Sequence, residues 1–252
     1  MLYATLTFWL LVIVFCAWGV HELWSRLVKP RVVNTVLLPG TLVAQLGHVL
    51  GLLVTGNSVQ NTALMSDDEE GKPQSETPES PKVPVVGPII IALLPLVACA
   101  ACLYAAAHFW GGGVLGDLSQ GAALAVPQSL PTSVAAVWDL LRSSITLMEQ
   151  VLNAILNSDW KHWPTLAFLY LAVCLTVRMT PFEGTRRGAI GAILVSGLLI
   201  ALLASAVQAV AEWVQTSWPI LSFAVGMLLL LLLFSLLVTG VVGLIKVMAK
   251  NA

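Results

Sequence analysis

The chain has 252 residues, of which 58% are hydrophobic and only 10% are charged, and its mean hydropathy is +0.90. A soluble domain carries about 25% charged residues, so this composition excludes a water-soluble globular protein and indicates an integral membrane protein. The formal net charge of −1 gives no sign of nucleic-acid binding, and membrane lipids are the expected surroundings.

Six apolar segments have the length needed to cross a bilayer, which is about 20 residues each. They are predicted at Leu2–Val20, Thr35–Thr55, Val86–Trp110, Trp163–Met179, Ala189–Val210 and Ile220–Val247. Each is expected to be a helix, because a helix satisfies its own backbone hydrogen bonds in lipid. The first has no basic segment ahead of it and no small-residue cleavage site, so we interpret it as an uncleaved span. The expected fold is an all-α, polytopic bundle of about six spans.

A further segment, Ser133–Asn157, has the pattern of an amphipathic helix. Its apolar residues recur at steps of three and four and form one stripe: Val134, Val137, Trp138, Leu141, Ile145, Met148, Leu152 and Ile155. Pro131, Thr132 and Ser133 are typical of a helix start. Such a helix lies along the membrane interface or packs on a partner subunit, and the pattern allows both.

A stretch between the second and third spans, Ser66–Pro84, contains six acidic residues and four prolines. It has too few apolar side chains to offset the entropy of ordering, so it is predicted to be a disordered linker. The chain then divides into six regions, which are the first span with a basic loop (1–34), the second span (35–65), the acidic linker (66–85), the third span with its loop (86–132), the amphipathic helix (133–158) and a three-span region (159–252).

The basic residues give a weak preference for one orientation. With six spans and a cytoplasmic N-terminus, seven of the twelve Lys and Arg residues face the cytoplasm, namely Lys72, Lys82, Arg178, Arg186, Arg187, Lys246 and Lys250. The positive-inside rule therefore predicts that both termini are cytoplasmic.

The centre of the second span carries the most informative motif, Ala44-Gln45-Leu46-Gly47-His48. A zinc-protease helix reads H-E-x-x-H, in which two His ligands lie one turn apart and the Glu activates the bound water. The surrounding sequence, from Pro-Gly before the motif to Thr-Gly-x-x-Val after it, resembles the first core helix of membrane-embedded zinc metalloproteases of the site-2 protease type. Ala44 and Gln45 stand where that family has its first ligand and its Glu, and His48 alone matches.

A second match lies at Asp159–Ala189, which is similar to a segment of bacterial relatives of the same family. There a tryptophan-rich entry and a span precede a pattern close to M-x-P-S-x-x-D-L-x-G-A, whose Asp is the third zinc ligand. Met179 and Pro181 match, but Thr185 stands at the Asp position. The intervening Val86–Leu96 resembles a third family segment. The resemblance implies a bacterial inner-membrane location.

The residues at these positions argue against catalysis. A catalytic zinc site needs three protein ligands, whereas Ala44 cannot ligate, Thr185 is a poor neutral ligand and Gln45 cannot act as a base. We therefore expect no metal, no cofactor and no enzymatic activity. His48 and Gln45 are then expected to be polar groups facing the interior of the bundle, as an inherited hydrogen bond or as a retained pocket.

Other candidate groups are weaker. His21-Glu22-Leu23-Trp24-Ser25 nearly repeats the motif, but Ser25 replaces the second His. Cys99 and Cys102 form a C-x-x-C inside an apolar helix, where small packing residues are expected. His108, His162 and Glu212 are predicted at the interface.

Two classes of function remain. The first is a structural or accessory subunit of a larger membrane complex with a protein partner, and the second is a small-molecule transporter or channel component. The second requires polar residues along the spans, which offer few beyond Gln45, His48 and Gln208. An active intramembrane zinc protease is ranked last.

Overall fold

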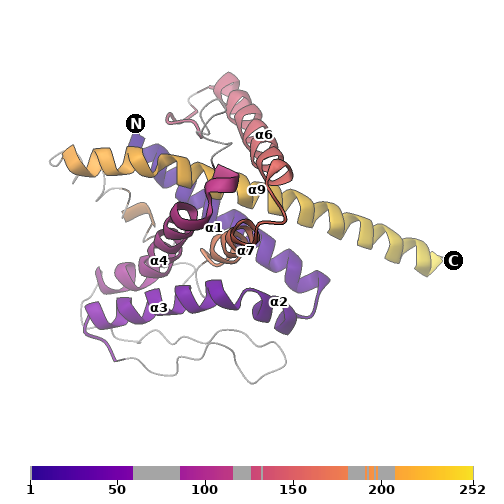
Figure 1. Cartoon of the computed structure of the whole chain (residues 1–252), viewed down its shortest axis with the longest axis horizontal. Coiled ribbons are helices and arrows are strands. Elements are labelled where there is room, and N and C mark those ends of the chain that lie inside the picture. The colour runs from indigo at the N-terminus through magenta and orange to yellow at the C-terminus, as the bar shows by residue number, and fades with distance from the viewer. Residues whose placement is uncertain are drawn as a thin grey trace.

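The computed structural model describes residues 2–58, 86–115, 126–131, 133–180, 191, 193–195, 197 and 208–251. Within these residues all regular secondary structure is helical, which confirms the all-α prediction (Figure 1). The helices are α1 (Leu2–Leu27), α2 (Pro30–Val36), α3 (Leu38–Val54), α4 (Val86–Trp110), α6 (Val134–Asn157), α7 (Trp163–Val177) and α9 (Gln208–Asn251).

Three of these helices are long and apolar enough to cross a membrane. They contain the stretches Leu2–Leu27, Gly87–Trp110 and Val214–Ala249, which correspond to the first, third and sixth predicted spans. The chain is therefore a multi-pass integral membrane protein.

The second predicted span, Thr35–Thr55, is not one helix. α2 ends at Val36, α3 begins at Leu38, and the two helices are bent by 77° relative to each other. Pro39 lies in the first turn of α3, where a missing backbone N–H costs nothing, so the sequence begins a new helix at this point. The expectation of a single straight span is corrected to a bent pair, either a broken span or a re-entrant segment.

The fourth predicted span is shorter than expected, and two other predicted segments lie largely or wholly outside the described residues. α7 has 15 residues and is therefore about 22 Å long, shorter than the hydrocarbon core of about 30 Å. The fifth predicted span, Ala189–Val210, falls mostly outside the described residues, and the acidic linker at Ser66–Pro84 falls wholly outside them.

α4 contacts α3 with its first half and α7 with its second half. The contacts, in order along α4, are Ile91 with Gly51, Cys99 with Arg178, and Trp110 with Trp163. α3 and α7 therefore follow one another along α4, and the end of α7 meets the start of α3 beside the middle of α4.

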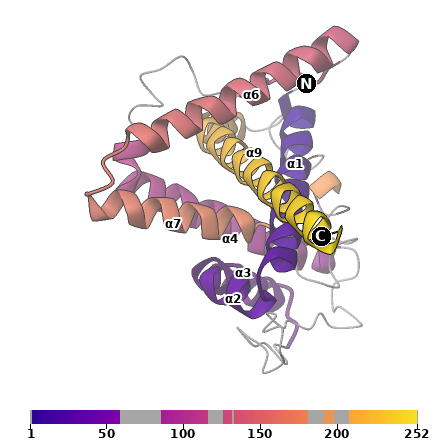
Figure 2. The same ribbon diagram turned by 90° about the vertical axis from the view of Figure 1, so that its right-hand side faces the viewer.

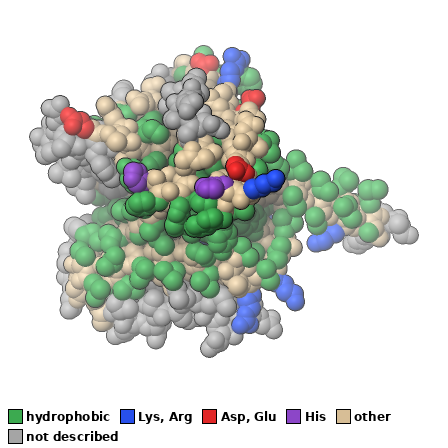
Figure 3. All heavy atoms as spheres, viewed as in Figure 1, with side chains coloured by type: hydrophobic (Ala, Val, Ile, Leu, Met, Phe, Trp, Pro, Cys, Tyr) green, Lys and Arg blue, Asp and Glu red, His purple; other side chains and the backbone are tan. Residues whose placement is uncertain are grey.

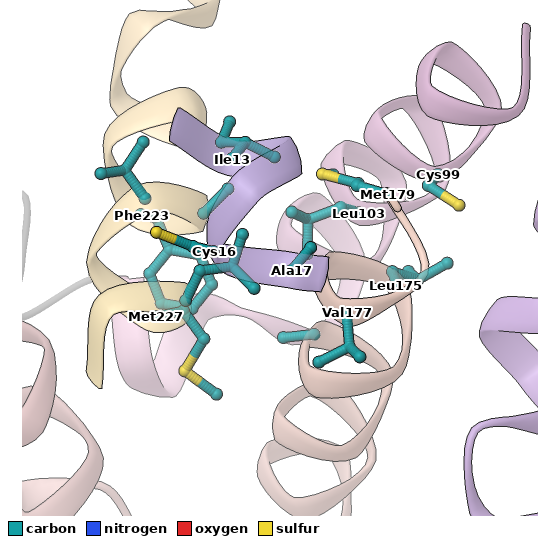
Figure 4. Packing of buried hydrophobic residues seen from close by; sticks show 14 of the residues in the cluster. Ile13, Cys16, Ala17, Cys99, Leu103, Leu175, Val177, Met179, Phe223 and Met227 are labelled. Carbon is teal, nitrogen blue, oxygen red and sulfur yellow. The ribbon is translucent and has the colours of Figure 1, made fainter. Parts of the chain in front are cut away.

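α1 and α9 pack side by side and run in the same direction. In their N-terminal halves, both helices bind the segment that includes Val126 and Pro127, through the indole nitrogens of Trp9 (3.1 Å to Pro127 O) and Trp218 (3.0 Å to Val126 O). Further along, Trp24 Nε1 donates to Ser235 Oγ at 2.7 Å. Between these points, Figure 4 shows the first helix placing Ile13 and Cys16 beside Phe223 and Met227.

This direction limits the number of crossings. Each crossing reverses the chain, so two spans that run the same way are separated by an odd number of other crossings. A six-span chain with α9 as its sixth crossing would place α1 and α9 antiparallel. If α1 and α9 both cross the bilayer, their parallel packing favours an odd number of crossings, whereas the six-span topology stays a prediction because its fifth span falls mostly outside the described residues.

α6 confirms the predicted amphipathic helix, and Ser133 caps it by accepting a hydrogen bond from the Ala136 N–H at 3.2 Å. Its buried face is not the predicted stripe, because the residues that it buries are Leu147, Val151 and Ala154. The first two lie against Gly226 of α9. The stripe itself is largely exposed, with Trp138 at 63%, and the first turns of α6 extend away from the other helices (Figure 2).

Candidate functional site

The motif residues of α3 lie on its buried face. Ala44, Gln45 and His48 are each no more than 3% exposed. α3 lies close to α4 because Gly47 and Gly51 have no side chains on the contact surface, as in other membrane helix pairs. A methyl group on Gly47 would lie 2.7 Å from the Leu94 carbonyl oxygen, and one on Gly51 would lie 2.9 Å from the Ile91 Cα.

This position matches the expectation that Gln45 and His48 face the interior of the bundle. Thr185, the third position of the resemblance, lies outside the described residues. Within the described residues, no group of three His, Cys, Asp or Glu side chains could hold a metal ion. The absence of a metal and of enzymatic activity remains a prediction.

The other candidate groups do not come together. Glu22 pairs with Arg26 at 2.9 Å on the surface of α1. Cys99 is buried whereas Cys102 is exposed, so the C-x-x-C pair points in two directions. His108 contacts the neighbouring Phe109 edge-on, and His162 lies at the start of α7, far along α4 from the motif.

The bent junction between α2 and α3 is a second polar site, and the sequence analysis missed it. Three residues of α7 and its C-cap, spaced four apart on one face, hold the junction: Tyr170, Cys174 and Arg178. Tyr170 Oη donates to the Val36 carbonyl oxygen at 2.8 Å, and Cys174 Sγ lies 3.5 Å from the same oxygen. The Val36 carbonyl, which lies at the break between α2 and α3, thus accepts a hydrogen bond from Tyr170. Backbone polar groups inside a membrane need such partners, because lipid offers none.

Arg178 completes this junction. Its Nη2 donates to Asn34 Oδ1 of α2 at 2.7 Å, and the whole residue is only 8% exposed. Arg178 was expected to be one of the basic residues facing the cytoplasm, whereas in the structure its side chain lies inside the bundle. The available signal was the i, i+4, i+8 spacing of Tyr170, Cys174 and Arg178, together with a proline in the first turn of both α2 and α3.

Close packing fixes the junction. A Cβ on Gly40, in the first turn of α3, would overlap the Cys174 carbonyl oxygen and lie 3.1 Å from Arg178 Cγ. Only glycine therefore lets α3 begin directly against the end of α7. The junction is a rigid meeting point of three helix ends beside the middle of α4.

Comparison with protein-family models, with curated proteins and with solved structures finds no match for this chain. The class that fold and sites define is a multi-pass helical membrane protein with a broken helix and a buried arginine at the break.

Proposed function

We propose that this chain is a non-catalytic structural or accessory subunit of a larger membrane complex. The observation that carries the proposal is the C-terminal part of α9, Leu236–Ala249, which we call the α9 overhang. A hydrogen bond between Trp24 and Ser235 joins α9 to α1 directly before the overhang, and every residue of the overhang is exposed or half-buried. Figures 1 and 3 show it extending from the body, coated with hydrophobic side chains.

The length of α9 exceeds what one bilayer covers. The uncharged stretch Ile220–Ile245 is about 39 Å long at 1.5 Å per residue, against a hydrocarbon core of about 30 Å. Lipid alone would cover it only at a tilt of about 40°, the upper end of the range for membrane helices.

The neighbouring α1 marks where water begins. Trp24 lies beside Ser235, and the exposed ion pair between Glu22 and Arg26 lies at the same level of α1. The overhang starts at this level and continues apolar for about 15 Å, to Ile245. A partner's apolar surface would cover this length, and an interfacial α6 offers a second surface through its exposed stripe.

The sequence resemblance gives separate support. Ala44, Gln45 and Thr185 stand where site-2-type proteases have two ligands and the general base, so a chain of that ancestry would retain the fold without the chemistry. The proposal includes a bacterial inner-membrane location, which rests on the resemblance alone.

Photo-crosslinking in native membranes tests the proposal. A benzophenone amino acid at Leu237 or Leu244 is expected to give one discrete protein adduct. The matched control is Leu46, which is equally exposed on α3 and lies away from the overhang. Adducts to lipid alone at Leu237 and Leu244, as at Leu46, would show that no subunit covers the overhang.

We also propose an orientation that differs from the initial expectation. If the chain crosses the bilayer five times, with α1 first, the bent pair of α2 and α3 second, α4 third and α9 last, the parallel packing of α1 and α9 is satisfied. Seven of the twelve basic residues then share the side of the C-terminus: Arg26, Lys29, Arg31, Arg142, Lys161, Lys246 and Lys250. The positive-inside rule places this side in the cytoplasm and the N-terminus outside.

A second candidate function is a transporter or channel component. The observation that favours it is the junction, because discontinuous helices with buried polar groups at mid-membrane form the substrate sites of many transporters. Solute flux into liposomes that contain the purified chain alone would favour this class, whereas no flux together with a stoichiometric partner favours the accessory subunit.

A further inference from the structure

We propose that the junction of α2, α3 and α7 binds a small carboxylate anion through Arg178 and Thr180. The inference rests on the contacts of these residues and holds for either proposed function. A carboxylate-bearing solute or metabolite is the chemical class that these donors fit.

The first observation is the incomplete hydrogen bonding of Arg178. Its Nη2 binds the neutral amide oxygen of Asn34, while its Nε is buried without an acceptor. Within the described part of the chain, the one ion pair joins Arg26 to Glu22, so no carboxylate there neutralises Arg178. A buried guanidinium at membrane depth is costly unless an anion accompanies it.

The second observation is that the hydroxyl group of Thr180 is also buried without a hydrogen-bond partner. By contrast, the hydroxyl of Thr176, on the last turn of α7, donates to the Ala172 carbonyl oxygen at 2.6 Å. Arg178 and Thr180, two residues apart after the end of α7, thus each carry a buried polar atom without a partner, whereas the Thr176 hydroxyl is bonded within its helix.

The third observation is the electrostatics of the helix ends. Arg178 caps the carbonyl end of α7, which offsets part of its charge, but the N-terminal turn of α3 lies directly against it. The positive end of a helix dipole beside a guanidinium favours an anion between or beside them. The planar guanidinium fork matches the two oxygens of a carboxylate.

The depth of the junction selects the source of the anion. Cys99, whose Sγ lies 3.9 Å from the Arg178 carbonyl oxygen, is at the middle of the apolar stretch Gly87–Trp110. If α4 crosses the bilayer, the junction lies near its centre, about 15 Å from either headgroup region. A lipid phosphate would not reach that depth, so the proposed ligand is the carboxylate of a small solute.

Formate, the smallest carboxylate, is the probe. The purified full chain in mild detergent is melted while sodium formate replaces sodium methanesulfonate at constant ionic strength, and unfolding is followed by tryptophan fluorescence. A saturable rise in melting temperature is expected. Arg178→Lys keeps the charge but loses the fork, so the half-saturating formate concentration should rise at least tenfold.

Two threonine variants provide a matched pair. Thr180→Val removes an unmet donor and should weaken the formate response several-fold, whereas Thr176→Val removes a hydroxyl already bonded within its helix and should leave the response unchanged. A rise that does not saturate, or one that is equal in wild type and Arg178→Lys, would overturn the proposal. Equal weakening by both threonine variants would likewise show a general loss of stability and no binding site.

Discussion

The bond between Arg178 and Asn34 should be one of the most sensitive points of the fold. Replacing Asn34 with Leu keeps a side chain of similar size but removes the acceptor that Arg178 Nη2 binds at 2.7 Å. A hydrogen bond to a charged group contributes about 1.5–3 kcal/mol, and leaving a buried charge without its partner costs about 3–5 kcal/mol. We expect Asn34→Leu to lower the free energy of unfolding by about 2–4 kcal/mol.

A double variant distinguishes loss of the Arg178–Asn34 hydrogen bond from simple loss of packing. In Asn34→Leu/Arg178→Met both polar partners are gone, so the second substitution should recover at least about 1 kcal/mol relative to the sum of the single effects. The assay is unfolding of the purified protein in mixed micelles of increasing SDS content, with the exposed Arg142→Met as the control for loss of one positive charge. Single effects that add to within about 0.5 kcal/mol would refute the coupling.

Four other outcomes follow from the packing. Tags at the two ends of the chain should report opposite sides of the membrane in protease-protection experiments, and same-side tags would contradict the parallel packing of α1 and α9. Gly47→Leu should lower the unfolding free energy by about 1–3 kcal/mol by forcing α3 from α4, whereas Gly243→Leu, where no atom lies within 4 Å, should have little effect in the same SDS titration. Tyr170→Phe should cost about 1 kcal/mol through the lost bond to Val36 O, and a silent substitution would show that water or lipid replaces the hydroxyl. Ser133→Ala should cost about 0.5–2 kcal/mol of helix stability, visible as loss of helical circular dichroism on heating, and an unchanged melting curve would show that the first turns of α6 are not coupled to the fold.

Hydropathy and periodicity predicted the elements that depend on composition alone. The three long apolar helices and the capped α6 appear where the sequence indicates, because lipid burial and a side-chain cap are local causes. The break at Leu37 was not predicted, because hydropathy reports the apolar run Thr35–Thr55 as a whole and carries no information on a bend within it. The apolar stripe of α6 is largely exposed, because the face that packs is the one that meets Gly226 of α9, which no local pattern reveals.

Of the candidate site residues, some have a burial that the sequence predicts and others do not. The burial of Gln45 and His48 follows from their position in an apolar helix, so it could be expected from the sequence. The burial of Arg178 could not, because its contacts come from Asn34, which lies 144 residues earlier in the chain. The parallel direction of α1 and α9 also depends on contacts between residues far apart in the sequence, and the orientation that we propose from it moves the N-terminus to the opposite side from the one expected.

The parallel pairing of α1 and α9 also sets the order of events during synthesis. The bond between Trp24 and Ser235 joins residues 211 positions apart, so α1 enters the membrane long before its companion exists. Until then, Ile13 and Cys16 lack their neighbours Phe223 and Met227 of α9 (Figure 4). The α1–α9 part of the core can therefore close only after α9 has been synthesised, so this pairing is a late step in assembly of the bundle.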